Sequence, residues 1–164
     1  PAGADFAKDP FLWRVSRARI EESGPFSLFP GYDRWLGVIS GVLEVRIQGQ
    51  PRAILDPNGV VHFSGEVSAT GQLQSGPVED FNLMIRKGAR ATLEMHSLRG
   101  WRSLFDDDGG SVGLIHVVSG ECRVNGQGQD YQVRGGQSLL MEPARPCGIE
   151  SANARVAIVS IYLS

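Results

Sequence analysis

The chain has 164 residues and a formal net charge of −2, from 16 Lys and Arg against 18 Asp and Glu. This length fits one compact unit or two small lobes that share a core. No basic block stands out and no long apolar run occurs, so neither nucleic acid nor a membrane is expected as a partner. The only cysteines are Cys122 and Cys147, and no signal-peptide pattern opens the sequence, which favours a reducing cytoplasm.

Short runs of alternating apolar and polar residues recur along the chain. They lie at residues 42–47, 91–95, 112–118, 131–133 and 156–163. Gly, Asn, Asp or Pro separates them, and no stretch repeats apolar residues at helical spacing over three turns. A period of two with frequent turn signals predicts an all-β sandwich or barrel.

A weak internal repeat is visible in the two halves of the sequence. Residues 38–45 and 117–124 each read as a strand, a Ser-Gly turn and a second strand. Duplicated β units can pack against each other and protect their sheet edges. The repeat predicts an N-terminal lobe at residues 1–86 and a C-terminal lobe at residues 87–164, together forming one compact unit.

Residues 23–34 combine dense turn signals with aromatic residues and end in the charged pair Asp33 and Arg34. Gly and Pro fix turns, so the segment is predicted to be a bent strand with a rigid corner. Such a corner can hold a guanidinium inside a pocket, and Arg suits a carboxylate because its planar fork makes two parallel hydrogen bonds. We therefore predict that Arg34 binds a small anion; the alternative is a surface arginine paired with Asp33.

A second candidate segment is the alternating run at residues 80–84. If it is a strand, Asp80, Asn82 and Met84 face one way, and Asn82 offers both a donor and an acceptor to a ligand. Asp80 and Asn82 could instead tie the crossover between the lobes. Other residues predicted to contribute to the site are Ser27, Phe29 and Phe63. Phe29, Phe63 and Trp101 are aromatic side chains that could line a pocket, although aromatic residues more often belong to the core.

Several motifs resemble the HutD family, also called the Ves family. They are Gly-Pro-Phe-Ser-Leu-Phe-Pro-Gly at residues 24–31 with the following Asp-Arg, His-Phe-Ser-Gly-Glu at 62–66, and Asp-Phe-Asn-Leu-Met at 80–84. The resemblance implies a bicupin, with two cupin-like β-barrel or jelly-roll lobes in one chain, and a link to bacterial histidine utilisation. The family's N-terminal Trp-Lys-Asn-Gly-Gly-Gly type of segment is not in this sequence.

The sequence gives only weak support for a metal-binding site. Metal-binding cupins use two histidines one residue apart, a carboxylate and a distant third histidine, and this chain has no His-x-His. An alternative two-histidine, one-carboxylate set would be Glu94, His96 and His116, of which the first two share a strand face. No cofactor and no catalytic residue are predicted.

Three function classes follow. The favoured one is a metal-free bicupin that senses or buffers a carboxylate-bearing intermediate of histidine degradation, such as urocanate or a formylglutamate-like molecule. The second is a metal-dependent cupin enzyme, an oxygenase or isomerase acting on a small carboxylate, so enzymatic activity stays open. The third is a structural or partner-binding β domain. The expected partner is a small anionic metabolite, with a homodimer possible through pairing of edge strands.

Overall fold

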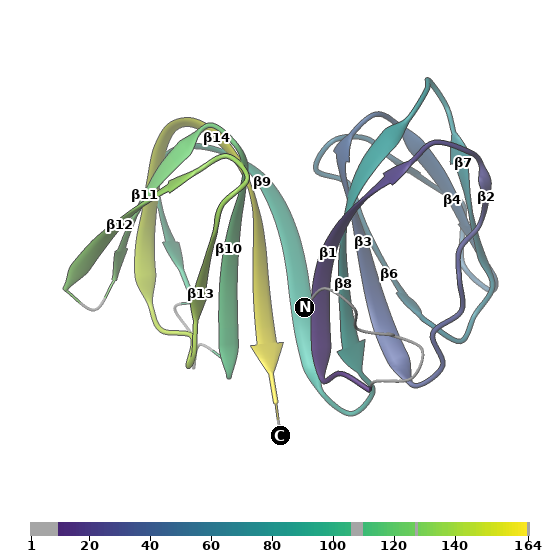
Figure 1. The fold of residues 1–164 in the computed structure, drawn as a ribbon, viewed down its shortest axis with the longest axis horizontal. Helices are drawn as coiled ribbons and strands as arrows, with labels where there is room; N and C mark the ends of the chain where they lie inside the picture. The colour runs from purple at the N-terminus through teal and green to yellow at the C-terminus, as the bar shows by residue number, and fades with distance from the viewer. Residues whose placement is uncertain (1–9, 106–109, 127, 164) are drawn as a thin grey trace.

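The computed structural model describes residues 10–105, 110–126 and 128–163. Within these residues the chain forms fourteen strands and no helix, which confirms the all-β prediction. No described segment could therefore cross a membrane as a helix. Figure 1 shows two barrel-like halves side by side, joined through the long strands β9 and β14.

The strands up to Arg86 form two four-stranded sheets, which we call the N-terminal barrel (Figure 1). The first sheet has the order β1 (Trp13–Ile20), β8 (Val78–Arg86), β3 (Tyr32–Ser40) and β6 (Val60–Ser64). The second sheet has the order β2 (Gly24–Pro25), β7 (Ala69–Leu73), β4 (Leu43–Ile47) and β5 (Ala53–Leu55). Of the predicted bent strand at residues 23–34, Gly24–Pro25 pair as β2 and residues 32–34 begin β3, whereas residues 26–29 run irregularly to the turn at Gly31, whose φ is 83°.

The later strands form one sheet, which we call the C-terminal barrel. Its order is β12 (Gln129–Arg134), β11 (Glu121–Gly126), β14 (Cys147–Tyr162), β10 (Val112–Ser119) and β13 (Ser138–Met141). The remaining strand, β9 (Arg90–Leu104), pairs antiparallel with the other side of β14. This order makes β12 and β13 the two edges of the main sheet.

The Ser-Gly turns that define the sequence repeat use the same conformation in both halves. Gly41 has a φ of 84° and Gly120 a φ of 82°, which L side chains rarely adopt. A Cβ at Gly41 would lie 2.8 Å from the carbonyl oxygen of Pro77, and one at Gly120 would lie 2.3 Å from that of Asn153. Both turns therefore require glycine for backbone conformation and for close approach.

Three apolar clusters hold the fold together. One fills the N-terminal barrel and includes Leu36, Leu43 and Val78, all fully buried. Another fills the C-terminal barrel and includes Ile115 and Ile149. The third cluster contains side chains from both halves, including Phe81, Leu83, Ile85, Met95, Val159 and Ile161. Burying a side chain of this size contributes roughly 1.5–3 kcal/mol, so the third cluster binds the halves firmly together.

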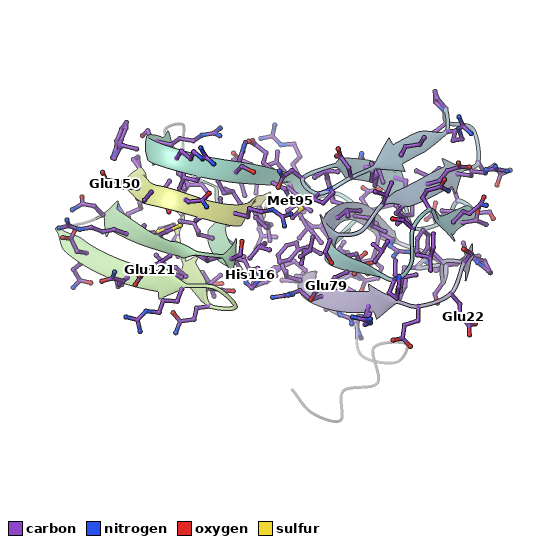
Figure 2. All side chains as sticks on the ribbon, turned by 90° about the horizontal axis from the view of Figure 1, so that it is seen from above. Glu22, Glu79, Met95, His116, Glu121 and Glu150 are labelled. Atoms are coloured by element: carbon purple, nitrogen blue, oxygen red, sulfur yellow. The ribbon has the colours of Figure 1, made fainter. Side chains whose placement is uncertain are left out.

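A buried histidine lies in this contact between the barrels. His116 is stacked on Phe81 with ring centroids 5.4 Å apart, and its Nε2 lies 3.3 Å from Nη1 of Arg17. Because arginine can only donate, Nε2 accepts, and Nδ1 donates to the hydroxyl of Ser138 at 2.9 Å. Figure 2 places His116 close to Glu79, whose carboxylate pairs with Arg17.

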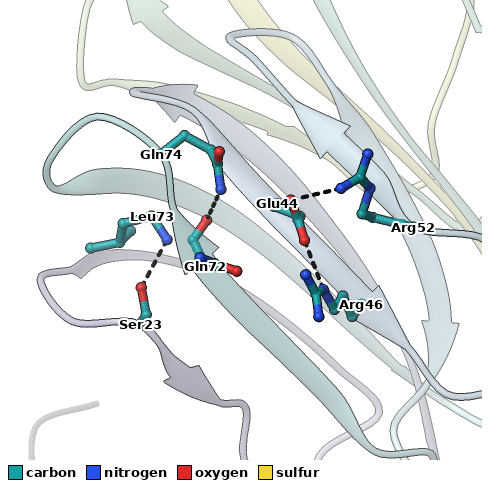
Figure 3. Close-up of polar contacts among 7 residues, drawn as sticks. All are labelled: Ser23, Glu44, Arg46, Arg52, Gln72, Leu73 and Gln74. Atoms are coloured by element: carbon teal, nitrogen blue, oxygen red, sulfur yellow. Dashed lines mark hydrogen bonds and ion pairs between the residues drawn. The ribbon is translucent and has the colours of Figure 1, made fainter.

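The outer face of the second sheet carries a separate ion-pair group (Figure 3). Glu44 is 5% exposed, and its two carboxylate oxygens lie 2.7 Å from Nε of Arg46 and 3.5 Å from Nη1 of Arg52. Leu43 and Val45 point to the barrel interior, so this group lies outside the barrel. It provides exposed arginines that can be mutated without touching the interior.

Candidate functional site

The first sheet of the N-terminal barrel brings the predicted polar residues onto one interior face. Arg34 on β3 lies opposite Met84 on β8 and opposite Phe63 on β6. Residues directly opposite each other project to the same side of a sheet, and side chains two apart on one strand share that side. Asp80, Asn82 and Met84 therefore face the barrel interior together, whereas Phe81 and Leu83 belong to the cluster between the barrels.

Strand β1 extends this face. Arg14 lies opposite Met84, Ser16 opposite Asn82, and Ala18 opposite Asp80. The interior face is thus polar along β1 and β8 and becomes apolar where Leu36 and Val38 lie on β3. Two arginines flank Met84, so this end of the barrel interior is cationic, and the buried carboxylate of Asp80 lies four residues away along β8.

Arg34 occupies an aromatic enclosure. Its side chain is 5% exposed, and its guanidinium carbon lies 5.1 Å from the ring centroid of Phe63, 5.2 Å from that of Phe29 and 5.8 Å from that of Phe26. Nη1 donates to the carbonyl oxygen of Ser27 at 2.9 Å. Burial lowers the pKa of Arg34, and the charge of Asp80 opposes that shift, so the buried group remains a cation.

Asp80 is the buried counterpart of this cation. It is 3% exposed, and its Oδ1 accepts a hydrogen bond from the backbone amide of Ala18 at 3.0 Å. Burial raises the pKa of Asp80, while hydrogen bonds from Asn82 and Ala18 and the charge of Arg34 act in the opposite direction. The amide nitrogen of Asn82 therefore donates a hydrogen bond to the carboxylate of Asp80, and the amide oxygen of Asn82 takes no part in this bond.

Two buried polar atoms of this cluster lack a partner within the described residues: Nε of Arg34 and Oδ1 of Asn82. An unsatisfied buried polar atom costs about 1–3 kcal/mol, and native proteins contain few of them. One of the two is a charged donor and the other is a neutral acceptor. A small molecule that carries both an anionic oxygen and an N–H or O–H group would satisfy both.

The structure thus brings together six of the seven predicted side chains around Arg34 or on its sheet face, which are Arg34, Asp80, Asn82, Met84, Phe29 and Phe63. Ser27 also contributes, but through its backbone carbonyl. Trp101, which was considered as a pocket or core residue, is neither, because it lies on β9 of the C-terminal barrel and is 66% exposed. Sequence reasoning missed Phe26, Arg14 and Ser16.

The alternative metal set is not assembled. Glu94 and His96 do meet, with Oε2 and Nε2 2.7 Å apart, and Arg102 lies against the same imidazole. His116 lies opposite Ala157 on β14, and Ala157 lies opposite Met95 on β9, so His116 projects to the same side as Met95 and to the other side of the sheet from His96. Within the described part of the chain, no three His, Cys, Asp or Glu side chains are grouped to hold a metal ion.

Two cupin-like barrels in one chain, with a polar cluster inside the first, define the class of protein as a bicupin. Solved structures of cupins share the fold, including a cupin 2 conserved barrel domain protein from Leptotrichia buccalis, with a TM-score of 0.58 over 93% of this chain and 85% of that one at 12% identity. The sequence model of the HutD family matches residues 1–158, and the chain belongs to that family, which is associated with histidine utilisation.

Relatives agree with this assignment. An uncharacterized 21.2 kDa protein in the hutC 3′ region of Pseudomonas putida is 35% identical over 125 residues, which is 76% of this chain; the chain spans 64% of that relative's length. A conserved protein of unknown function from Pseudomonas aeruginosa PAO1 has a TM-score of 0.86 and 28% identity over 94% of this chain and 82% of its own. HutD from Pseudomonas fluorescens SBW25, solved in a formate condition, has a TM-score of 0.76 and 24% identity over 99% and 84%.

Proposed function

We propose that this chain binds a carboxylate-bearing intermediate of histidine degradation and thereby senses or buffers it. The N-terminal lobe, residues 1–86, would hold the ligand, and the C-terminal lobe, residues 87–164, would support that lobe through the shared apolar cluster. The observation that carries the proposal is the pair of unpartnered buried atoms, Nε of Arg34 and Oδ1 of Asn82, on one interior face.

The chemistry of the pair supports two ligand types. A carboxylate oxygen accepts from the guanidinium of Arg34, and an N–H group donates to Asn82. N-formylglutamate offers carboxylates and an amide N–H, and urocanate offers a carboxylate and an imidazole N–H. The three phenylalanine rings around Arg34 exclude water from the ion pair, which strengthens it.

The expected affinity is moderate. A hydrogen bond to a charged group contributes roughly 1.5–3 kcal/mol net, so two or three such contacts support dissociation constants in the micromolar-to-millimolar range. That range suits a metabolite sensor or buffer, which must release its ligand when the concentration falls. The family's association with histidine utilisation favours the two ligands named over other small acids.

Isothermal titration tests the proposal with matched ligands. We expect saturable heat with urocanate or N-formyl-L-glutamate. Imidazole, which lacks the carboxylate, and acetate, which lacks the N–H group, should bind at least about tenfold more weakly, because each loses one of the two contacts. Absence of heat with both acids up to millimolar concentration would contradict the proposal and favour a structural or partner-binding role.

A further inference from the structure

The C-terminal barrel contains a pocket that the N-terminal site does not use. It has a volume of about 190 Å³ and lies where the sheet fails to close, between its edge strands β12 and β13. Figure 1 shows β12 at the outer end of this half and β13 beside β10. The pocket lining is mixed: polar groups make up a large part of it, and its apolar side chains include Val124, Leu139, Met141, Pro143, Pro146 and Cys147.

The size of the pocket limits its occupant. An apolar cavity of about 150 Å³ is known to hold benzene, so a pocket of about 190 Å³ accepts one phenyl ring or a branched aliphatic group of similar bulk. Leu140 and Tyr131 also line it and are 47% and 40% exposed. Large apolar side chains left open to solvent beside an apolar hollow favour burial by a ligand.

Two opposite charges complete the lining. Glu142 and Arg145 are both exposed and stand three residues apart on the segment that joins β13 to β14. Neither forms a hydrogen bond or an ion pair with another side chain in the part of the chain that the structure describes. A carboxylate and a guanidinium beside the apolar side chains of one pocket match a ligand that carries both charges close together next to an apolar group.

We propose that this pocket is a second ligand site, for a free α-amino acid with an apolar side chain of the size of leucine, methionine or phenylalanine. The side chain enters the hollow lined by Leu139 and Met141, the carboxylate pairs with Arg145, and the ammonium group pairs with Glu142. The site lies in the other half of the chain from Arg34, so a test of this second site is independent of a test of the proposed function.

The three methionines of the chain provide a direct test, because each reports on a different region. Met84 faces the N-terminal barrel interior, Met95 belongs to the cluster between the barrels, and Met141 lines the pocket. With the methionine methyl groups labelled by ¹³C, titration with L-phenylalanine or L-leucine should move the Met141 resonance in a saturable manner. The resonances of Met84 and Met95 should stay in place.

Ligand analogues and variants sharpen the test. 3-Phenylpropionate lacks the ammonium group and phenethylamine lacks the carboxylate, and each should bind at least about fivefold more weakly than phenylalanine. Arg145→Ala should weaken phenylalanine binding to a similar extent. Arg134→Ala, which removes an exposed arginine of the same barrel that pairs with Glu121 outside the pocket, should leave it unchanged.

Leu139→Trp should fill the hollow and abolish the shift of Met141. The proposal is overturned if no apolar amino acid moves the Met141 resonance at tens of millimolar. It is equally overturned if 3-phenylpropionate binds as tightly as phenylalanine, or if the Met84 resonance moves instead. All of the ligand comparisons use the unmodified chain, so a variant that fails to fold does not decide the outcome.

Discussion

Replacing Arg34 by methionine separates a ligand-binding role from a structural one. Methionine has similar length and fills an apolar site flexibly, so the three phenylalanine rings keep a neighbour while the charge and all donors are lost. Each charge-assisted hydrogen bond to the ligand carboxylate contributes roughly 1.5–3 kcal/mol, and its loss lowers affinity about 10- to 150-fold. Arg34→Met should therefore reduce binding of urocanate or N-formylglutamate by at least tenfold.

Stability should change much less. The substitution loses the hydrogen bond to the Ser27 carbonyl, about 1 kcal/mol, and cation–π contacts of about 0.5–2 kcal/mol. It also removes the unpartnered buried Nε, which costs about 1–3 kcal/mol in the wild type. Asp80 loses the favourable charge of Arg34 but keeps its hydrogen bonds from Ala18 and Asn82, and its raised pKa allows protonation to limit that loss. The terms nearly cancel, so the free energy of unfolding should shift by no more than about 2 kcal/mol.

Titration calorimetry measures the affinity of the Arg34→Met variant, and urea denaturation measures its stability. Arg46→Met is the matched control, because Arg46 pairs with Glu44 outside the barrel (Figure 3). Full affinity in Arg34→Met would refute the ligand role. A loss of more than about 4 kcal/mol of stability would show instead that Arg34 is retained to hold the segment at residues 26–29 in place.

Three further changes test the physical reasoning. Asp80→Asn should stabilise the chain at neutral pH, because burial raises the pKa of Asp80 and its ionisation in the folded state opposes folding. The gain in the free energy of unfolding should shrink as the pH falls toward 3.8, which urea denaturation at several pH values would show. His116→Gln should remove part of the stability loss on acidification. Burial and Arg17 lower the pKa of His116, so the unfolded chain takes up this proton at a higher pH than the folded chain does. Equal losses of stability between pH 7.5 and 5.5 in both proteins would contradict this. Gly65→Ala should destabilise the fold by about 2 kcal/mol or more and weaken ligand binding, because a Cβ there would lie 2.4 Å from the Phe29 carbonyl oxygen. Gly24→Ala is the control: its Cβ would have no atom within 4 Å, so thermal unfolding should show almost no change in stability.

The sequence predicted those parts of the site that follow from strand parity. Alternation in residues 80–84 correctly placed Asp80, Asn82 and Met84 on one face, because β8 is a regular strand. The same parity placed Glu94 beside His96. Parity within one strand says nothing of the register between strands, so it could not show that His116 projects to the opposite side.

Contacts made by irregular segments were beyond sequence reasoning. Ser27 was predicted as a site residue without a stated contact, and the path of residues 26–29 presents its carbonyl to Arg34 and brings Phe26 over the guanidinium. Trp101 was considered for the pocket by residue type alone, and residue type does not show where a side chain lies. Arg14 and Ser16 could have been found, because they alternate with the apolar residues Trp13 and Val15.

The most direct test of the central claim is a crystal structure of the chain with N-formyl-L-glutamate or urocanate bound. The proposed function predicts ligand density inside the N-terminal barrel, with a carboxylate oxygen about 3 Å from Nε of Arg34 and an N–H group directed at Oδ1 of Asn82. Density for the acid only in the C-terminal barrel, or at the surface with Arg34 and Asn82 untouched, would contradict it.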